Sequence, residues 1–284
     1  MPDLNVTMVA FHGNAKPKPL EKLLQDVLGA ITANLPPSLT WAFKSYSFAQ
    51  IHATIIGMEV DVVDGRFYSR WFRKNRGQER LIDVDRLREK VKQDIRDNRL
   101  FTIRFGGFPE AYCKCKDDPQ ARETWSCASS PSGFHSCDRS TYEGSFYAFS
   151  PGPLVITGWP VCGPRELETF PHRLYEFRQS VEEAGFLDKY HSDEKPHWKD
   201  DDCFMRVGTF SGVLPYEQLR ATEKAVRDYL SDRKPVAVDV TVDDVSILLY
   251  DDPSLEKGHV KQCVPLANFL EDPSAVKRLY GTLL

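Results

Sequence analysis

Residues 4–108 alternate between short apolar runs and longer segments whose apolar positions recur at helical spacing. The short runs predict strands, because they are rich in β-branched and aromatic residues. The longer segments predict amphipathic helices. The expected strands are 4–13, 39–48, 52–60 and 100–108, and the expected helices are 20–35 and 84–98.

The pattern is lost over residues 109–150, which are rich in Ser, Gly, Pro and charged residues. Such a segment predicts a long insertion. Order then returns, with expected strands at 153–161 and 203–212, helices at 165–186 and 215–232, a long strand or hairpin at 236–252 and an edge strand near 259–270. Strands often follow one another without a helix between them, which favours an α+β fold. We expect one domain over 1–284, with lobe one at about 1–108 and lobe two at about 151–284.

The composition indicates a globular protein that would bind any charged partner through a local patch of its surface. The chain has 284 residues, 41% of them hydrophobic, which is enough for a substantial core. A net charge of −4 excludes a global polycation, so any nucleic-acid partner must be held by a local basic patch. The N-terminus lacks the pattern of a secretory signal, and no apolar run is long enough to span a membrane. The cysteines Cys162, Cys203 and Cys263 stand singly in apolar surroundings, as reduced thiols do. We therefore expect a cytoplasmic protein without a membrane partner.

His52 interrupts the apolar, β-branched segment 50–60. In a strand, residues two positions apart project from the same face, so His52 and Thr54 would point together to one side of a sheet. One interpretation is a histidine satisfied by a backbone partner at a strand end. The other is a functional pair.

The second buried strand repeats part of this motif. "HATIIG" from His52 and "VGTFSG" from Val207 share Thr in the third place and Gly in the sixth. The two segments lie about half the chain apart, which indicates an internal repeat. In this alignment Thr209 corresponds to Thr54, and Val207 corresponds to His52.

Through these segments, and through "VDDVSILLYDDPSLE" near the C-terminus, the chain resembles the two-histidine (2H) phosphoesterases, which include RNA 2′,3′-cyclic phosphodiesterases and 2′-5′ RNA ligases. The resemblance implies a bilobal, pseudo-symmetric α+β fold. Two mixed or antiparallel sheets would line a central groove, with helices outside. It also implies that one imidazole accepts a proton and the other donates one, while His52, Thr54 and Thr209 face a phosphodiester. No cofactor is expected.

Val207 departs from that pattern, since valine can neither accept nor donate a proton. Either the chemistry is lost or another group fills the vacancy. Arg206 is the nearest candidate, although a regular strand would turn it to the opposite face from Val207, and a bulge would be needed to bring it inward. The remaining candidates are His191, His197 and His259.

Basic and aromatic residues alternate just after the His52 strand. Arg66, Arg70, Arg73 and Lys74 recur at the spacing of one helix face, with Trp71 on a neighbouring face. This composition suits phosphate neutralisation and base stacking. It equally suits a solvated face whose aromatic rings pack on the core.

A cysteine cluster within the insertion has the ligand types of a zinc site. Its members are Cys113, Cys115, Cys127 and Cys137, with His135 nearby. A C-x-C pair replaces the usual C-x₂-C spacing, so an ordinary insertion that bears cysteines is favoured and no metal is expected.

Three functions follow from these residues. The first is a cyclic phosphodiesterase that acts on a phosphodiester, cyclic nucleotide or RNA end, with His52 as its general acid or base. The second is a catalytically degenerate module that binds the same nucleotide or RNA ligand. The third is a protein that interacts through residues 109–150. The sequence leaves the oligomeric state open.

Overall fold

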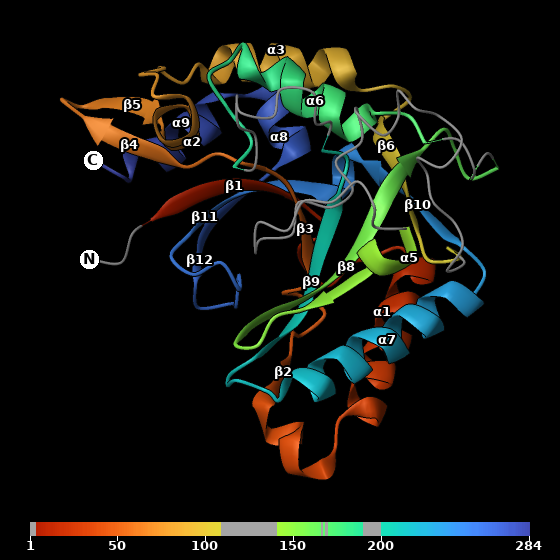
Figure 1. Cartoon of the computed structure of the whole chain (residues 1–284). Helices are drawn as coiled ribbons and strands as arrows, with labels where there is room; N and C mark the ends of the chain where they lie inside the picture. Colours follow the sequence, from red (N-terminus) through yellow and green to blue (C-terminus); the bar gives the residue numbers. More distant parts are fainter. Residues whose placement is uncertain (1–3, 109–140, 166, 168–169, 190–199) are drawn as a thin grey trace.

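The chain folds into an α+β structure, seen in a computed structural model that describes residues 4–108, 141–165, 167, 170–189 and 200–284 (Figure 1). Everything below concerns these residues. All strand pairings between them are antiparallel. No helix in these ranges is both long and apolar enough to cross a membrane.

Within the described ranges ten strands join in one large sheet, whereas two sheets were expected from the sequence to line the groove. The order is β10-β6-β8-β9-β3-β1-β11-β12, with β2 beside β9 and β7 beside β8. The strands are β1 Asn5–Ala10, β2 Phe43–Ser45, β3 His52–Gly57, β6 Arg99–Phe105, β7 Phe146–Ala148, β8 Gly152–Val161, β9 Cys203–Phe210, β10 Val236–Thr241, β11 Val245–Tyr250 and β12 Val260–Pro265. The sheet is continuous because β3 and β9 pair directly. A separate ribbon holds β4 Val60–Val63 and β5 Arg66–Ser69.

The strand order is symmetrical about the boundary between β9 and β3. Strand β3 is followed outward by β1 and β11, and β9 is followed outward by β8 and β6. Along the chain, β1, β3 and β6 form one series, and β8, β9 and β11 form a second. The last strand of each series pairs with the first strand of the other series, since β6 pairs with β8 and β11 pairs with β1. The two series therefore have the same topology on either side of the β3–β9 boundary.

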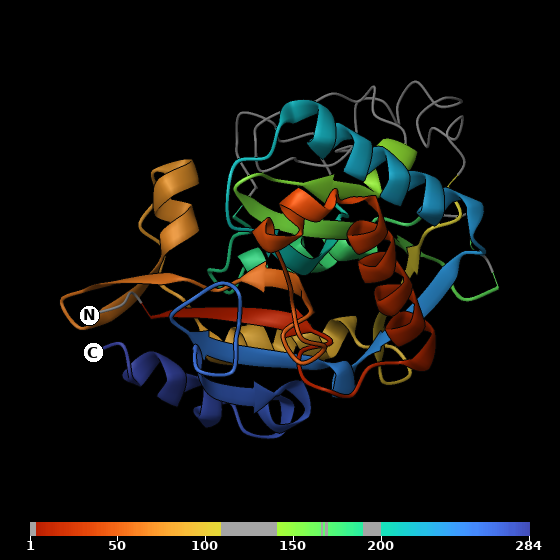
Figure 2. The same ribbon diagram turned by 90° about the horizontal axis from the view of Figure 1, so that it is seen from below.

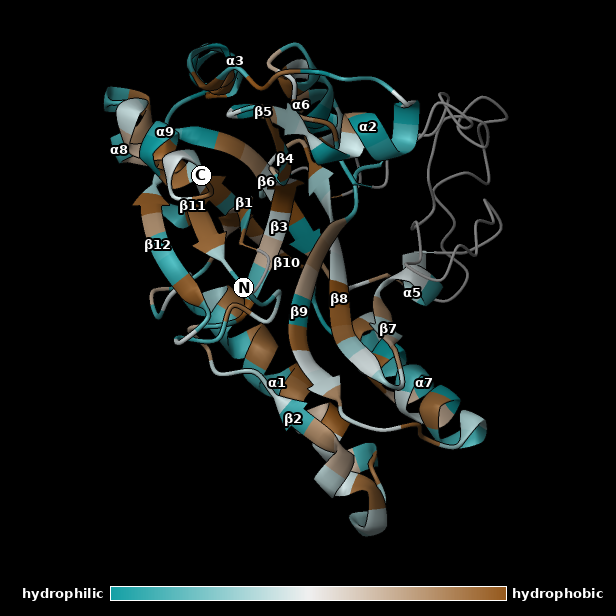
Figure 3. Cartoon of the chain, turned by 90° about the vertical axis from the view of Figure 1, so that its left-hand side faces the viewer, coloured by the Kyte–Doolittle hydropathy of each residue, from teal (hydrophilic) through white to brown (hydrophobic). Residues whose placement is uncertain are grey.

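Helices cover the sheet in two pairs. Helix α1 (Lys18–Asn34) packs beside α7 (Tyr216–Asp232), and α3 (Val84–Asp94) packs beside α6 (Arg173–Glu182) (Figures 1 and 2). Their apolar faces turn inward, and the core strands are the most hydrophobic part of the molecule, whereas α2 and α3 present hydrophilic residues (Figure 3). The shorter helices are η1 Pro37–Ala42, α2 Arg70–Arg76, α5 Thr141–Gly144, η2 Val242–Asp244, α8 Leu266–Glu271 and α9 Ser274–Gly281.

Most elements lie where the hydrophobic pattern predicts them. The edge strand expected near 259–270 is confirmed for its first half, β12, whereas its second half belongs to the helix α8. The strand expected at 39–48 is wrong for most of its length. It forms the turn η1 and the short β2, because the hydroxyl of Thr40 and the indole of Trp41 bond to local carbonyls.

Two further boundaries differ from the expectation. Residues 141–148 were assigned to the insertion, but they form α5 and β7, and Phe146 and Tyr147 are buried against the sheet. The segment 236–252 is interrupted by η2, where Thr241 and Asp244 form a capping box, and its halves β10 and β11 lie on opposite sides of the sheet.

Candidate functional site

The central strands β3 and β9 bring the predicted site residues together. His52 is paired with Arg206, and Ala53 is paired with Met205. Residues directly opposite in an antiparallel pair project from the same face of the sheet. His52 and Arg206 therefore share one face, while the fully buried Ala53 and Met205 face the core.

Each central strand contains a bulge at the same place. Relative to β1, strand β3 has one extra residue, Ile55, which directly follows Thr54. Relative to β8, strand β9 has one extra residue, Val207, which directly follows Arg206. A bulge changes which face the following residues occupy. Counted from the Ala53–Met205 pair, the two bulges occupy equivalent places, two residues further along each strand.

The positions of the bulges correct the correspondence expected from the sequence. Counted from the bulges, His52 corresponds to Phe204 and Thr54 to Arg206, so the alignment of His52 with Val207 is displaced by three residues. Val207 is 0% exposed and lies in the core. The hydroxyl of Thr209 donates to the carbonyl of Gly152 (2.9 Å), and Thr209 does not line the pocket.

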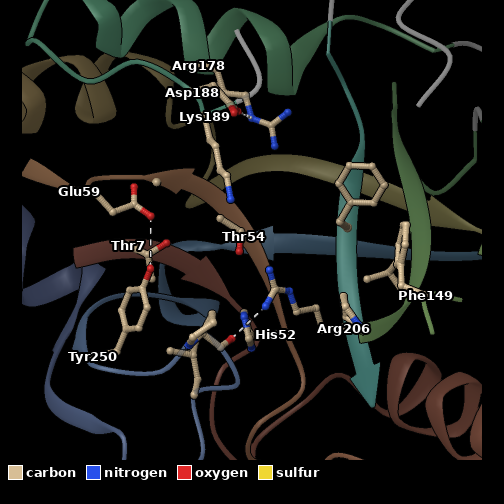
Figure 4. Close-up of a pocket in the computed structure, with 16 residues that line it drawn as sticks. Thr7, His52, Thr54, Glu59, Phe149, Arg178, Asp188, Lys189, Arg206 and Tyr250 are labelled. Atoms are coloured by element: carbon tan, nitrogen blue, oxygen red, sulfur yellow. Dashed lines mark hydrogen bonds and ion pairs between the residues drawn. The ribbon is translucent and has the colours of Figure 1, made fainter. Parts of the chain in front are cut away.

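A pocket of about 150 Å³ opens over this face of the sheet (Figure 4). His52, Thr54, Phe204 and Arg206 line its floor. Phe149 and Val155 stand beside Phe204 at one end, and Thr7, Glu59 and Tyr250 stand at the other. The aromatic, cationic and hydroxyl groups of both strands thus converge on one space.

His52 is a neutral imidazole at physiological pH. Its side chain is nearly enclosed, and burial lowers the pKa of the ring to about 3, with the charge of Arg206 acting in the same direction. The Nδ1 atom lies 2.6 Å from the carbonyl oxygen of Gln50. A carbonyl only accepts, so Nδ1 donates and Nε2 keeps its lone pair.

Arg206 supplies a fixed positive charge beside His52. Its guanidinium donates to the carbonyl of Pro253 (3.2 Å), which is the hydrogen bond it makes within the described residues. Because a guanidinium has five donors in a planar fork, the group can also bind an anion in the pocket. Thr54 is the next residue of β3 after His52 that faces the pocket, and it adds a hydroxyl group to the pocket.

Glu59 is a pocket residue that the sequence analysis did not single out. Its Oε2 accepts from the indole nitrogen of Trp71 (2.7 Å), and its Oε1 accepts from the hydroxyl of Tyr250 (3.2 Å). Burial and the nearby carboxylate of Glu59 raise the pKa of Tyr250, so this phenol stays protonated and donates. Only the fold could reveal this group, since Tyr250 is distant in the chain.

An ion-pair network closes the pocket on the side of α6. Asp188 lies 2.7 Å from the buried guanidinium of Arg178, which also pairs with Asp200 (3.2 Å). Burial raises the pKa of Asp200 to about 6. The ammonium of Lys189 reaches over the pocket, 5.4 Å from the centre of the Trp71 ring. Arg178 holds the wall in place, and Lys189 adds positive charge.

The basic residues of the α2 region lie outside the pocket. Arg70 and Arg73 share the carboxylate of Asp61 at 3.0 and 3.1 Å, which offsets one of their two positive charges. Lys74 lies over the Trp71 ring, and Arg66 is exposed on β5 rather than on the helix face expected for it. Of this set, Trp71 comes nearest the pocket, through its bond to Glu59.

Of the remaining candidates, the structure describes His259, which does not line the pocket. His259 pairs with Asp251 (2.7 Å) in the connection between β11 and β12. His191 and His197 lie outside the described residues, as do Cys113, Cys115, Cys127, Cys137 and His135. Within the described ranges, no group of His, Cys, Asp and Glu side chains is arranged to hold a metal ion.

Comparisons with protein-family models, with curated proteins and with solved structures found no match to this chain. A function must therefore be argued from the arrangement of the strands and from the chemistry of the pocket they carry.

Proposed function

We propose that the protein is a bilobal, 2H phosphoesterase-like module that binds the phosphate of a nucleotide, cyclic nucleotide or RNA end. One observation carries the proposal. His52-x-Thr54 and Phe204-x-Arg206 occupy equivalent positions on two paired strands, each directly before a bulge, and all four side chains line one pocket. A guanidinium, a hydroxyl and a neutral imidazole together suit an anion that also accepts hydrogen bonds.

The same residues favour binding over turnover. Hydrolysis with two imidazoles needs one base and one acid, and Phe204 occupies the position equivalent to His52. The surviving histidine is also a weak base, since its pKa of about 3 is far from neutral pH. Arg206 stays charged and cannot transfer a proton at neutral pH. The module therefore holds its ligand without cleaving it.

The other functions predict different pockets. An active phosphodiesterase needs a second proton donor beside His52. An interaction module without a ligand needs no polar pocket, yet this one exposes a cation and hydroxyl groups over the centre of the sheet.

The test is a calorimetric titration with adenosine 2′,3′-cyclic monophosphate, followed by chromatography of the nucleotide. We expect binding that weakens as salt is raised, because the contact is between a cation and a phosphate, and we expect the cyclic phosphate to remain intact. Turnover that disappears in His52→Ala would establish the enzyme instead. An absence of binding at low salt would reject both the enzyme and the binding module.

A further inference from the structure

We propose that Glu59 makes this pocket selective for guanine among the nucleobases. The inference rests on the proposed function, since it takes the phosphate to lie at Thr54 and Arg206. Glu59 stands at the opposite end of the pocket, where its carboxylate faces the interior (Figure 4). A nucleotide that spans the pocket would present its base to this carboxylate.

Glu59 keeps its negative charge available to a ligand. Its two hydrogen bonds come from neutral donors, the indole of Trp71 and the hydroxyl of Tyr250. Among the described residues no salt bridge reaches it, whereas the other carboxylate of the pocket, Asp188, pairs with Arg178. A carboxylate has about four acceptor positions, so each oxygen retains one for the ligand.

The strand separates this carboxylate from the proposed phosphate position by about the length of one nucleotide. The bulge at Ile55 turns Gly57 to the pocket side, and Glu59 Oε2 lies over Gly57, where a Cβ atom would collide with it. Thr54 and Gly57 are three strand residues apart, or about 10 Å. That span is comparable to the distance between the phosphate and the base edge of a single nucleotide.

The surroundings favour a neutral donor over a cationic ligand group. Lys74 and Lys189 flank the Trp71 ring, each 5.4 Å from its centre, and would repel an ammonium placed beside Glu59. Guanine presents two parallel donors, N1–H and the 2-amino group, which match the two oxygens of a carboxylate. Adenine, cytosine and uracil each place an acceptor beside their donor, and a carboxylate repels it.

The test compares the 2′,3′-cyclic monophosphates of guanosine, inosine, adenosine and cytidine by calorimetry. Guanosine should bind about 5- to 150-fold more tightly than adenosine or cytidine, the range of a bidentate contact. Inosine, which lacks the 2-amino group, should fall between them. Glu59→Gln should weaken guanosine binding and remove the preference, and adenosine should bind no more weakly than to wild type, because the repulsion of its acceptor is also removed. Glu79→Gln, which removes an exposed carboxylate outside the pocket, is the matched control and should keep it.

A second variant tests whether the position of the Glu59 carboxylate, and not its charge alone, produces the preference for guanine. Gly57→Ala leaves the charge of Glu59 unchanged but displaces its carboxylate, so it should also lose the preference. Equal affinity for guanosine and adenosine in the well-folded wild-type protein would overturn this inference and leave the phosphate site intact. Failure of every nucleotide to bind would overturn the proposed function as well.

Discussion

Strands β3 and β9 share a backbone design and differ in the chemistry of their side chains. Each has two pocket residues followed by a bulge, at Ile55 in one strand and Val207 in the other. Strand β3 presents an imidazole and a hydroxyl, and β9 presents an aromatic ring and a guanidinium. Symmetry of the fold therefore does not extend to symmetry of proton transfer.

The difference indicates how one architecture can support either catalysis or binding. A hydroxyl and an imidazole on both strands would allow an acid and a base to face one phosphate. With Phe204 and Arg206 on β9, one strand instead offers stacking and a permanent charge, both of which stabilise a bound nucleotide.

Restoring the symmetry should have the largest effect. Phe204→His places an imidazole on the pocket face at the position equivalent to His52, so turnover of a 2′,3′-cyclic nucleotide should rise by about 10²- to 10⁴-fold over wild type. Chromatography of the products measures the rate. Phe204→Leu should show no gain, and adding His52→Ala should abolish it. An equally active Phe204→Leu variant would refute the assigned equivalence.

A histidine at position 207, three residues after Phe204, should destabilise the folded protein without restoring turnover. Val207→His buries a larger polar ring in the core and should lower the free energy of unfolding by about 3 kcal/mol without producing turnover. Urea denaturation measures the loss. Val207→Ile tests the effect of volume alone and should be milder. Activity in a stable Val207→His protein would support the original alignment.

The buried imidazole should make stability depend on pH. The folded protein holds the pKa of His52 at about 3, below its ordinary 6.5, so the unfolded chain binds a proton that the folded chain refuses. Stability from this group is complete above the ordinary pKa and falls as the pH drops through that window, by up to about 1.4 kcal/mol per pH unit.

Urea denaturation at several values of pH should therefore show a steeper loss for wild type than for His52→Asn. Asparagine keeps a donor for the Gln50 carbonyl but does not titrate. Parallel curves for the two proteins would mean that His52 is not held neutral by burial.

The α2 region should matter least. Lys74→Ala removes an exposed charge outside the pocket, and solvent and salt screen such charges. We expect less than about a 2-fold change in nucleotide affinity. A larger change in a calorimetric titration would bring α2 into the binding site.

Local sequence patterns predicted the α+β class and most strands, and the family resemblance implied that the two motif strands meet, as β3 and β9 do. Local patterns also singled out His52 and Thr54, which line the pocket. They assigned the wrong residues of β9 to the pocket, because the bulge at Val207 changes which side chains face it. The alternation of residues within one strand does not reveal such a bulge. The shared threonines and glycines matched the wrong positions, although Ile55 and Val207 are both β-branched residues directly after the motif.

Glu59 was not identified from the sequence for a different reason. Its partners Trp71 and Tyr250 come from α2 and β11, and only the tertiary fold brings them together. Arg70 and Arg73 were expected from the sequence as phosphate contacts, but the fold pairs both with Asp61. Pairing in the folded chain thus decides which charged residues are free to bind a ligand.

The most direct measurement is a ³¹P NMR titration of adenosine 2′,3′-cyclic monophosphate with wild type, Arg206→Ala and Arg66→Ala. The phosphorus resonance should shift with wild type and with Arg66→Ala, which removes an exposed arginine outside the pocket. Arg206→Ala should weaken binding about 10- to 100-fold, because it removes a charge-assisted hydrogen bond. Equal affinity of Arg206→Ala and wild type would contradict a phosphate site between β3 and β9.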